Sequence, residues 1–354
     1  MSHQSALMSG SGTSIDIHQL TRVQDPGLAT EFHRWPLPDY IWPALERCYH
    51  SIFCTEPQLR ISGSLTSHVE AWVSRRHGCI NAIILFERFK HQLRVLNEVV
   101  TLPATILDEF ADAVFAIYPE LQVVILRAVT IDGLLKRRMT FAAEISDDYV
   151  LTLPTDKETW QRSLSSRSRE KLRNYLRRVQ QRAPTFSFET LSVGEFDLSK
   201  IKQVLVFSRA RMQTKGKHFG MSAVDEHQLC QLMLERGQLS LINIDGEPRA
   251  GLLCTRVGRD VFMHVIAHNP AFDDLRLGYL CCALTIEAAI TQGSQRFHFL
   301  WGHYDYKTRL GGERQLLSRA LIFRYPWQVL LQPGQMIEHM TALLRARLRR
   351  MRRR

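Results

Sequence analysis

The sequence predicts an α+β fold in which helices flank a mixed, mostly antiparallel sheet. Apolar runs at 239–244, 249–257 and 261–267 are separated by two short turns, DGEP and GRD, as is typical of an antiparallel meander. Segments with apolar residues at helical spacing lie before and after this meander. A similar order of helices and strands can be read in the first half of the chain, which favours two tandem halves built alike.

The first half is assigned to residues 36–153, after a polar and patternless segment at 1–35 that we expect to be flexible. Its expected elements, in chain order, are helices at 38–48 and 66–76, a hairpin of strands at 80–87 and 92–100, a helix at 102–118 and a buried strand at 121–128. Helices that cover a sheet in this order form an α+β layer.

The second half is assigned to residues 154–325. Thr155 and Glu158 form the pattern of a capping box at the start of a long basic helix. The remaining elements are a strand at 185–191, helices at 200–213 and 224–236, the meander, a loop at 269–277, a helix at 279–291, a strand at 296–300, a short helix near 304–309 and a strand at 318–323. Residues 326–354 are expected to form a helical, arginine-rich tail.

Composition indicates a soluble protein, since 45% of the 354 residues are hydrophobic and 23% are charged. The longest apolar runs are too short for a membrane-spanning helix, and the N-terminus lacks the basic and apolar regions of a secretory signal. Seven cysteines occur without metal-like spacing, and an odd number argues against a disulfide framework. We therefore expect a cytoplasmic protein with reduced thiols and no metal site.

The net charge of +11 is concentrated in two places. The last ten residues carry seven arginines, and residues 161–182 carry eight basic residues against Glu170. The charge of these two segments together exceeds the net charge of the whole chain, so the rest of the chain is slightly acidic. This distribution argues against a general nucleic-acid binder. The tail is either a solvated extension or a contact for an anionic membrane surface or another polyanion. The basic helix carries an apolar stripe, so its arginines either cover its wet face or meet a phosphate.

The segment from 261 to 291 predicts a strand, a loop and a helix that together suit a pyrophosphate. Free backbone N–H groups and the helix dipole favour negative charge where a helix begins. Gly278 lies at that point and permits close approach of a phosphate, and Arg276 adds a cation. A glycine before a helix is also a routine structural feature.

Three segments carry a resemblance to a known family. They are W-x-x-x-L-S-S-x-S-R at 160–169, AHNPAFDDLRLGYL at 267–280 and FHFLWGHYDYKTRLGG at 297–312. The second half of the chain resembles the CelD-like branch of GNAT acetyltransferases, which occurs with bacterial polysaccharide synthesis. The first half resembles it more faintly. GNAT proteins are related to the Fem-type aminoacyltransferases, in which an aromatic residue and a lysine at a place similar to Tyr306 and Lys307 handle the acyl donor.

The resemblance implies a GNAT-like fold and an acyl-CoA co-substrate, with no permanently bound cofactor. It places the coenzyme A pyrophosphate at the loop before Gly278 and the thioester beside the strand at 261–267. The implied donor-binding residues are Val265, Ile266, Ala267, Arg276, Leu277, Gly278 and Tyr279. The usual phosphate loop reads Q/R-x-x-G-x-G/A, whereas this chain has D-L-R-L-G-Y, with a single glycine.

Attack of an amine on a thioester requires positioning, a proton acceptor, an oxyanion donor and a proton for the departing thiolate. His264 is the candidate base, with His268, His298 and His303 as alternatives. Alternation of His264 with Phe262 and Ile266 equally suits a hydrogen-bonded histidine on a buried face. The candidates that act on the leaving group or on substrate charge are Tyr304, Tyr306 and Lys307, with Asp305 beside them. In the structural alternative Tyr306 packs and Lys307 forms an ion pair.

Three functions remain open from the sequence. The first is transfer of an acyl group, expected to be acetyl, from coenzyme A to an amine or hydroxyl of a sugar or cell-envelope precursor. The second is a Fem-type transfer from aminoacyl-tRNA that uses the basic segments on phosphates. The third is an inactive GNAT-fold scaffold that docks on an anionic surface.

Overall fold

The computed structural model describes residues 14–16, 27–214, 216 and 220–351, and these fall into two compact units. Unit 1 contains the described residues up to 49 together with 53–145 and 317–351. Unit 2 contains residues 50–52 and 146–316. Two long strands, β8 (Thr140–Thr152) and β14 (Glu313–Phe323), contribute residues to both units. Residues 317–323 of the last strand and the tail up to residue 351 therefore fall in the first unit, whereas the sequence assigned residues up to 325 to the second half.

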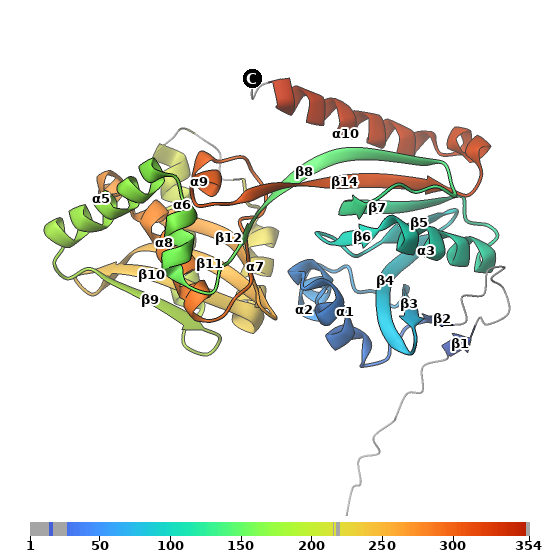
Figure 1. Cartoon of the computed structure of the whole chain (residues 1–354), viewed down its shortest axis with the longest axis horizontal. Helices are drawn as coiled ribbons and strands as arrows, with labels where there is room; N and C mark the ends of the chain where they lie inside the picture. Colours follow the sequence, from blue (N-terminus) through green and yellow to red (C-terminus); the bar gives the residue numbers. More distant parts are fainter. Residues whose placement is uncertain (1–13, 17–26, 215, 217–219, 352–354) are drawn as a thin grey trace, which may run out of the picture. The chain divides into compact units, whose positions relative to one another are not determined.

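Unit 1 places its helices on both faces of a sheet (Figure 1). Two short helices, α1 (Ile41–Tyr49) and α2 (Glu56–Ile61), precede three antiparallel strands, β3 (Val69–Arg76), β4 (Cys79–Phe89) and β5 (Gln92–Val95). Helix α3 (Ala104–Ile117) then returns the chain to β7 (Val123–Asp132), which runs parallel to β5. The end of β14 pairs antiparallel with β7, and β2 (Leu28–His33) pairs with β3. Two short strands, β1 (Ser14–Asp16) and β6 (Thr101–Pro103), pair with β2 and β7.

The two faces of the unit 1 sheet have different covers. The apolar side of α3 packs on one face, against Trp72, Phe86 and Leu126. On the other face α1 and α2 cover β3 and β4. The segment η3 (Pro326–Leu331) and helix α10 (Pro333–Met351) cover β7 and β14 on that same face, through Met336 and Val329. The strip of sheet between these two covers carries polar side chains.

Unit 2 repeats this arrangement. It begins with α4 (Lys157–Ser163), α5 (Ser166–Arg182) and the edge strand β9 (Ser187–Ser192). Helices α6 (Leu198–Thr214) and α7 (Ala223–Arg236) precede the antiparallel strands β10 (Gly237–Ile244), β11 (Glu247–Val257) and β12 (Asp260–His268). After the short 3-10 segment η2 (Pro270–Leu275), α8 (Leu277–Thr291) leads to β13 (Arg296–His298), which runs parallel to β12.

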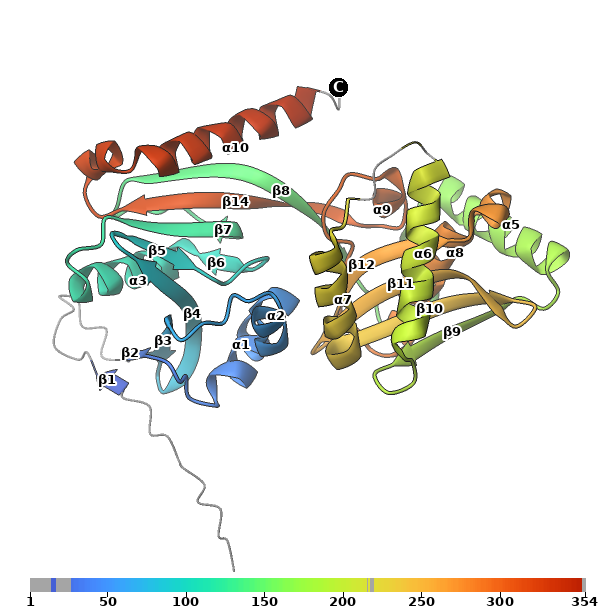
Figure 2. The same cartoon turned by 180° about the vertical axis from the view of Figure 1, so that it is seen from behind.

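In both units two helices are followed by a three-strand meander, a crossover helix and a strand parallel to the last meander strand. A parallel neighbour requires such a crossover, because a short turn joins only antiparallel strands. The predicted α+β fold with a mostly antiparallel sheet and two similar halves is therefore confirmed. Figure 2 shows α6 and α7 lying across the strands of unit 2. The opposite face carries α4, α5 and α8.

Several local predictions are wrong, each for a physical reason. The helix expected at 66–76 is strand β3, in which six successive residues are buried between helices on both faces, so no period-two alternation is visible. The expected flexible segment at 1–35 contains β2, and its other residues up to 26, apart from β1, lie outside the described part. Asp156, rather than Thr155, caps the basic segment by accepting a hydrogen bond from the Thr159 N–H at 2.7 Å. That segment is two helices, because Leu164 and Ser165 have extended backbone.

All seven cysteines are free thiols, and five of them are buried. Among the described residues, no helix is long and apolar enough to cross a membrane. Within the same residues, no group of three or more His, Cys, Asp or Glu side chains is arranged to hold a metal ion.

Candidate functional site

The central feature of unit 2 is the divergence of β12 from β13. The two strands pair at only three positions, from Asp260 with Arg296 to Phe262 with His298. Beyond this point β12 stays with β11 as far as His268. The chain after β13 turns instead to β8, where the Phe299 N–H donates to the Tyr149 carbonyl at 2.7 Å. The main chain of β12 from 263 onward therefore has a sheet neighbour on one side only.

A β-bulge in β12 coincides with this divergence. Leu253 of β11 faces Val265 and Cys254 faces Met263, so His264 is the extra residue between two successive pairs. Bulges redirect a side chain and end regular pairing. The predicted donor-binding residues Val265, Ile266 and Ala267 lie directly after the bulge. Val265 and Ala267 pack toward α6 and α7, and Ile266 packs on the core beneath α8.

Helix α8 begins close to the end of this open strand. Arg276 is its N-cap residue, has left-handed backbone at φ 56° and makes no side-chain cap. The first main-chain hydrogen bond of α8 runs from the Leu280 N–H to the Arg276 carbonyl, at 3.2 Å. The N–H groups of Leu277, Gly278 and Tyr279 thus have no acceptor within the helix. Such a helix start favours an anion.

The segment η2, which precedes α8, carries two carboxylates. Asp273 contacts the His268 ring at 3.1 Å and the Arg276 guanidinium at 3.7 Å. Asp274 is ion-paired with Arg182 of α5. Both carboxylates are more than half exposed but each has a basic partner, so the helix start is electrically mixed rather than acidic.

Gly278 has a packing role that the sequence did not indicate. It lies inside the first turn of α8 rather than before the helix. A Cβ at this position would lie 3.1 Å from Nδ1 of His268, which is tighter than most real contacts. The absent side chain therefore admits the His268 ring beside the helix start. Tyr279, the next residue, makes an edge contact with Tyr175 of α5 at 5.7 Å between ring centroids, and burial raises its pKa to about 12.

His264 is held by β11. Its Nε2 lies 2.8 Å from the hydroxyl oxygen of Thr255. The Thr255 residue is fully buried. Loss of water around the ring lowers the pKa of His264 to about 4, so the imidazole is neutral at pH 7. A neutral ring is able to accept a proton, although burial makes it a weak base. The geometry also satisfies the structural interpretation of a hydrogen-bonded histidine.

Lys307 organises the loop that follows β13. Its side chain is 1% exposed, and Nζ donates to the carbonyl oxygens of Phe299, Leu300 and Trp301 at 2.7–2.9 Å. Burial lowers the pKa of Lys307 to about 8, while Asp148 acts in the opposite direction. All three donors of the ammonium group are used by these carbonyls. The Lys307 ammonium group therefore points at main-chain carbonyls instead of forming the ion pair of the structural alternative.

The two candidate tyrosines stack on one another at the start of α9 (Asp305–Arg309), with 6.0 Å between ring centroids. Tyr306 is half-buried and packs on the core under α8, and burial raises its pKa far above the usual value. Tyr304 is 55% exposed. Of the pair, Tyr304 is the hydroxyl that a substrate can reach.

The remaining histidines differ in access. His303 is exposed and its Nδ1 lies 2.5 Å from the Tyr149 hydroxyl. His268 is buried and contacts Asp273. His268 is the last residue of β12, whereas His303 lies in the loop between β13 and α9.

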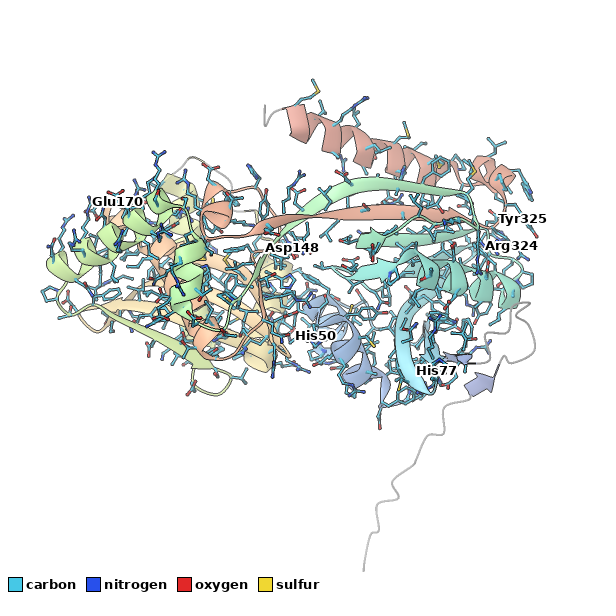
Figure 3. All side chains as sticks on the ribbon, viewed as in Figure 1. His50, His77, Asp148, Glu170, Arg324 and Tyr325 are labelled. Carbon is cyan, nitrogen blue, oxygen red and sulfur yellow. The ribbon has the colours of Figure 1, made fainter. Side chains whose placement is uncertain are left out.

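A buried ionic network lies where β12 and β13 separate, and sequence reasoning missed most of it. The His298 ring is stacked on Phe262, and its Nδ1 lies 2.7 Å from the carboxylate of Asp148. Asp148 lies on β8 and is labelled in Figure 3. Asp260 accepts from Arg296 at 2.6 Å and also faces His298. Burial lowers the pKa of His298, but the bonds to Asp148 and Asp260 outweigh it and raise the pKa overall. Because 150 residues separate Asp148 from His298, no local pattern indicates this pair.

Helix α5 supports the site from the outside. Arg178 donates to the Asp274 carbonyl at 3.2 Å, next to the Arg182 ion pair. Most of its other basic side chains are exposed. The preceding helix is anchored by the fully buried Trp160, whose ring nitrogen donates to the Leu310 carbonyl at 3.2 Å.

Comparison with known proteins shows which domains and folds this unit and the whole chain resemble. Residues 166–308 match the family model of the acetyltransferase (GNAT) domain. The crystal structure of FemX superposes with a TM-score of 0.59 at 11% identity, over 83% of this chain and 98% of that chain. Residues 166–308 are thus similar to a GNAT acetyltransferase domain, and the chain shares the fold of FemX.

Two further solved structures are less similar. The C-terminal domain of a putative lysylphosphatidylglycerol synthetase from Agrobacterium fabrum gives a TM-score of 0.44 at 10% identity, over 74% of this chain and 85% of that chain. A tandem GNAT protein from the clavulanic acid biosynthesis pathway gives 0.35 at 10% identity, over 75% and 87%. No curated protein sequence matches the chain.

Proposed function

We propose that the chain transfers an acyl group, expected to be acetyl, from coenzyme A to an amine or hydroxyl of a sugar or cell-envelope precursor. The observation that carries this proposal is the separation of β12 from β13 next to the uncapped start of α8. One unpaired strand edge and one anion-favouring helix start lie within a single strand, turn and helix unit. A donor with an amide-containing arm and a pyrophosphate suits both.

The donor arm is proposed to run along β12 from 263 to 267. An extended chain with amide groups adds to an unpaired strand edge through main-chain hydrogen bonds. The N–H groups of Leu277, Gly278 and Tyr279 would receive the pyrophosphate, and Arg276, which is 56% exposed, would add a cation. Only one glycine is present in this turn, so we expect weaker donor binding than in a glycine-rich loop.

The chemistry is direct transfer. The acceptor nitrogen or oxygen attacks the thioester carbonyl, the C–S bond breaks and coenzyme A leaves as thiolate. A main-chain N–H of β12 would stabilise the oxyanion. His264 is the proposed acceptor of the proton from the attacking group, and Tyr304 would return a proton to sulfur. Tyr306 would pack behind Tyr304, and Lys307 would hold the loop on which both depend.

A second candidate function is Fem-type transfer from an aminoacyl-tRNA. It is favoured by one observation, the FemX fold over most of the chain. The exposed arginines of α5 would then meet RNA phosphates. Such binding weakens steeply with salt, because each phosphate contact releases counterions.

The deciding experiment combines mass spectrometry of co-purified ligand with a thermal-shift panel of acyl-CoAs. Saturable stabilisation by an acyl-CoA, retained at moderate salt, supports the first function. Binding of aminoacyl-tRNA that is lost between low and moderate salt supports the second. No stabilisation by any acyl-CoA and no RNA binding would refute both and favour an inactive scaffold.

We also propose a peripheral contact between α10 and an anionic membrane on the cytoplasmic side. One side of α10 exposes an apolar stripe of Ile337, Met340, Leu344, Leu348 and Met351. Arg345 and Arg347 are exposed beside it, and the sequence continues with arginines that lie outside the described residues. An apolar stripe flanked by arginine matches helices that lie in the interface of anionic bilayers.

A further inference from the structure

A second candidate binding site lies in unit 1, on the strip of sheet left between the covering helices. It is a groove of about 650 Å³. Side chains from β4, β5, β7, β14 and α10 line it. Gln335 and Glu338 of α10 form one wall of the groove. Figures 1 and 2 show α10 running beside the strand pair β8 and β14. This groove shares no residue with the proposed acyl-transfer site.

The α10 wall is fixed by a chain of glutamines. Gln92 on β5 accepts from the side chain of Gln335 at 3.0 Å and donates to Gln332 at 2.7 Å. Gln332 in turn donates to Gln122 at 2.6 Å. Polar side chains on a helix and a sheet, joined in this way, hold the groove open at a defined width.

Cationic side chains dominate the lining. Arg88, Lys90, Arg94, Arg127 and Arg319 face only two carboxylates, Glu87 and Glu338. Arg94 is paired with Glu87 and Arg319 with Glu338, at 3.0 and 2.9 Å. Arg88 is paired outside the groove, with Glu70 and Glu120. The ion pairs therefore leave the positive charge of the groove in excess.

Among these residues, Arg319 is buried and has an unsatisfied donor. It is 4% exposed and lies on the floor of the groove, and its Nε has no hydrogen-bond partner among the described residues. Arg127, which is exposed, lies close enough to act on it electrostatically. Glu338 and Gln335 accept hydrogen bonds from the terminal nitrogens of Arg319. A further anion would use the remaining Nε donor and offset the repulsion between Arg319 and Arg127.

We propose that this groove binds a phosphate-bearing ligand with at least two negative charges. Phosphate accepts several charge-assisted hydrogen bonds at once, which suits the clustered guanidinium groups. The ring of Phe89 is 69% exposed at the groove, with Nζ of Lys90 5.4 Å from its centroid. The organic part of the ligand contacts this ring, and the phosphates reach Arg127 and Arg319.

The test is calorimetric titration of inorganic pyrophosphate into the full chain at low salt. We expect saturable binding tighter than about 1 mM. Arg127→Glu should weaken it at least about 10-fold, because one charge-assisted contact becomes a repulsion. The matched control is Arg47→Glu, an exposed arginine of α1 outside the groove, which should change the affinity less than about 2-fold. Equal weakening in both variants, or no saturable binding to the unaltered chain, would overturn the proposal.

Two further arms identify the organic part and separate this site from the donor site. Tighter binding of ADP than of pyrophosphate, reduced by Phe89→Ala, would indicate a nucleotide. Tighter binding of glycerol 1-phosphate would indicate a lipid headgroup. Gly278→Val should leave pyrophosphate binding to the groove intact, and Arg127→Glu should leave stabilisation by acyl-CoA intact. Loss of pyrophosphate binding in Gly278→Val would assign it to unit 2 and refute the groove.

Discussion

Replacing Lys307 by methionine tests whether this residue is a buried cap or a group that acts on substrate. The ammonium group donates to three carbonyl oxygens and is 1% exposed. Its removal takes the ammonium donor away from the carbonyls of Phe299, Leu300 and Trp301. Each unsatisfied group costs about 1–3 kcal/mol, offset in part by removing a buried charge. We expect Lys307→Met to lower the free energy of unfolding of unit 2 by about 2–4 kcal/mol near neutral pH.

The pH dependence gives a sharper test, because its sign follows from the lowered pKa of Lys307. The folded pKa is about 8 and the ordinary value is 10.5. Between these values the unfolded chain binds the proton more tightly, so this residue makes stability rise as the pH rises. Between about pH 7.5 and about pH 9.5, the titration of Lys307 raises the free energy of unfolding by about 2 kcal/mol. Tyrosine and cysteine also titrate in this range, so only the difference between variants is informative.

The assay is urea unfolding of the unaltered chain, Lys307→Met and the control Lys157→Met at the two pH values. Lys157 is an exposed lysine of α4. The unaltered chain and Lys157→Met should change together with pH, and Lys307→Met should lack the rise of about 2 kcal/mol. If all three change in parallel, Lys307 is not a buried cation with a lowered pKa, and our interpretation of its role is wrong.

Three other predictions concern the proposed sites. Gly278→Val should raise the acetyl-CoA concentration needed for a given thermal stabilisation at least about 10-fold, because the valine methyl groups displace His268 at the helix start. The far-UV circular dichroism spectrum should stay unchanged. Undiminished binding would remove this turn from the donor site. His264→Ala should lower kcat by about 100-fold or more with little change in donor binding, as steady-state kinetics would show, and full activity would exclude it as the base. Ile337→Glu with Leu344→Glu should abolish sedimentation with vesicles rich in phosphatidylglycerol, whereas Leu234→Glu on α7 should not; equal loss would argue against α10 as the contact.

The meander and the helix after it were predictable because their signals are local. Strands β10 to β12 are separated by turn sequences, and α8 is a mostly apolar segment. Strand β3 was misassigned because Val69, Trp72 and Val73 also fit helical spacing. Its first six residues are buried only because helices lie on both faces of the sheet. Strand β8 was missed because Asp147 and Asp148 interrupt its apolar pattern. Both are buried with partners distant in sequence, Arg314 and His298.

In the candidate site too, the features set by local sequence were predictable, and those set by contacts between distant segments were not. The sequence located the strand, the turn and the helix start, since backbone geometry follows from local pattern. It did not reveal that Lys307 points at main-chain carbonyls, because the positions of 299–301 depend on how β13 meets β8. The packing of Gly278 against His268 likewise requires the turn of η2 between them.

Unit 1 is discontinuous in the chain, with consequences for how the protein forms during synthesis. Its strand β7 gains its partner β14 only when residues 318–323 emerge, after the whole of unit 2. Until then the edge of β7 offers unpaired N–H and C=O groups, as exposed sheet edges do. We expect nascent chains that end near residue 153 to aggregate or to bind chaperones. A fragment designed to isolate the first unit would have to graft residues 317–351 directly onto residue 145.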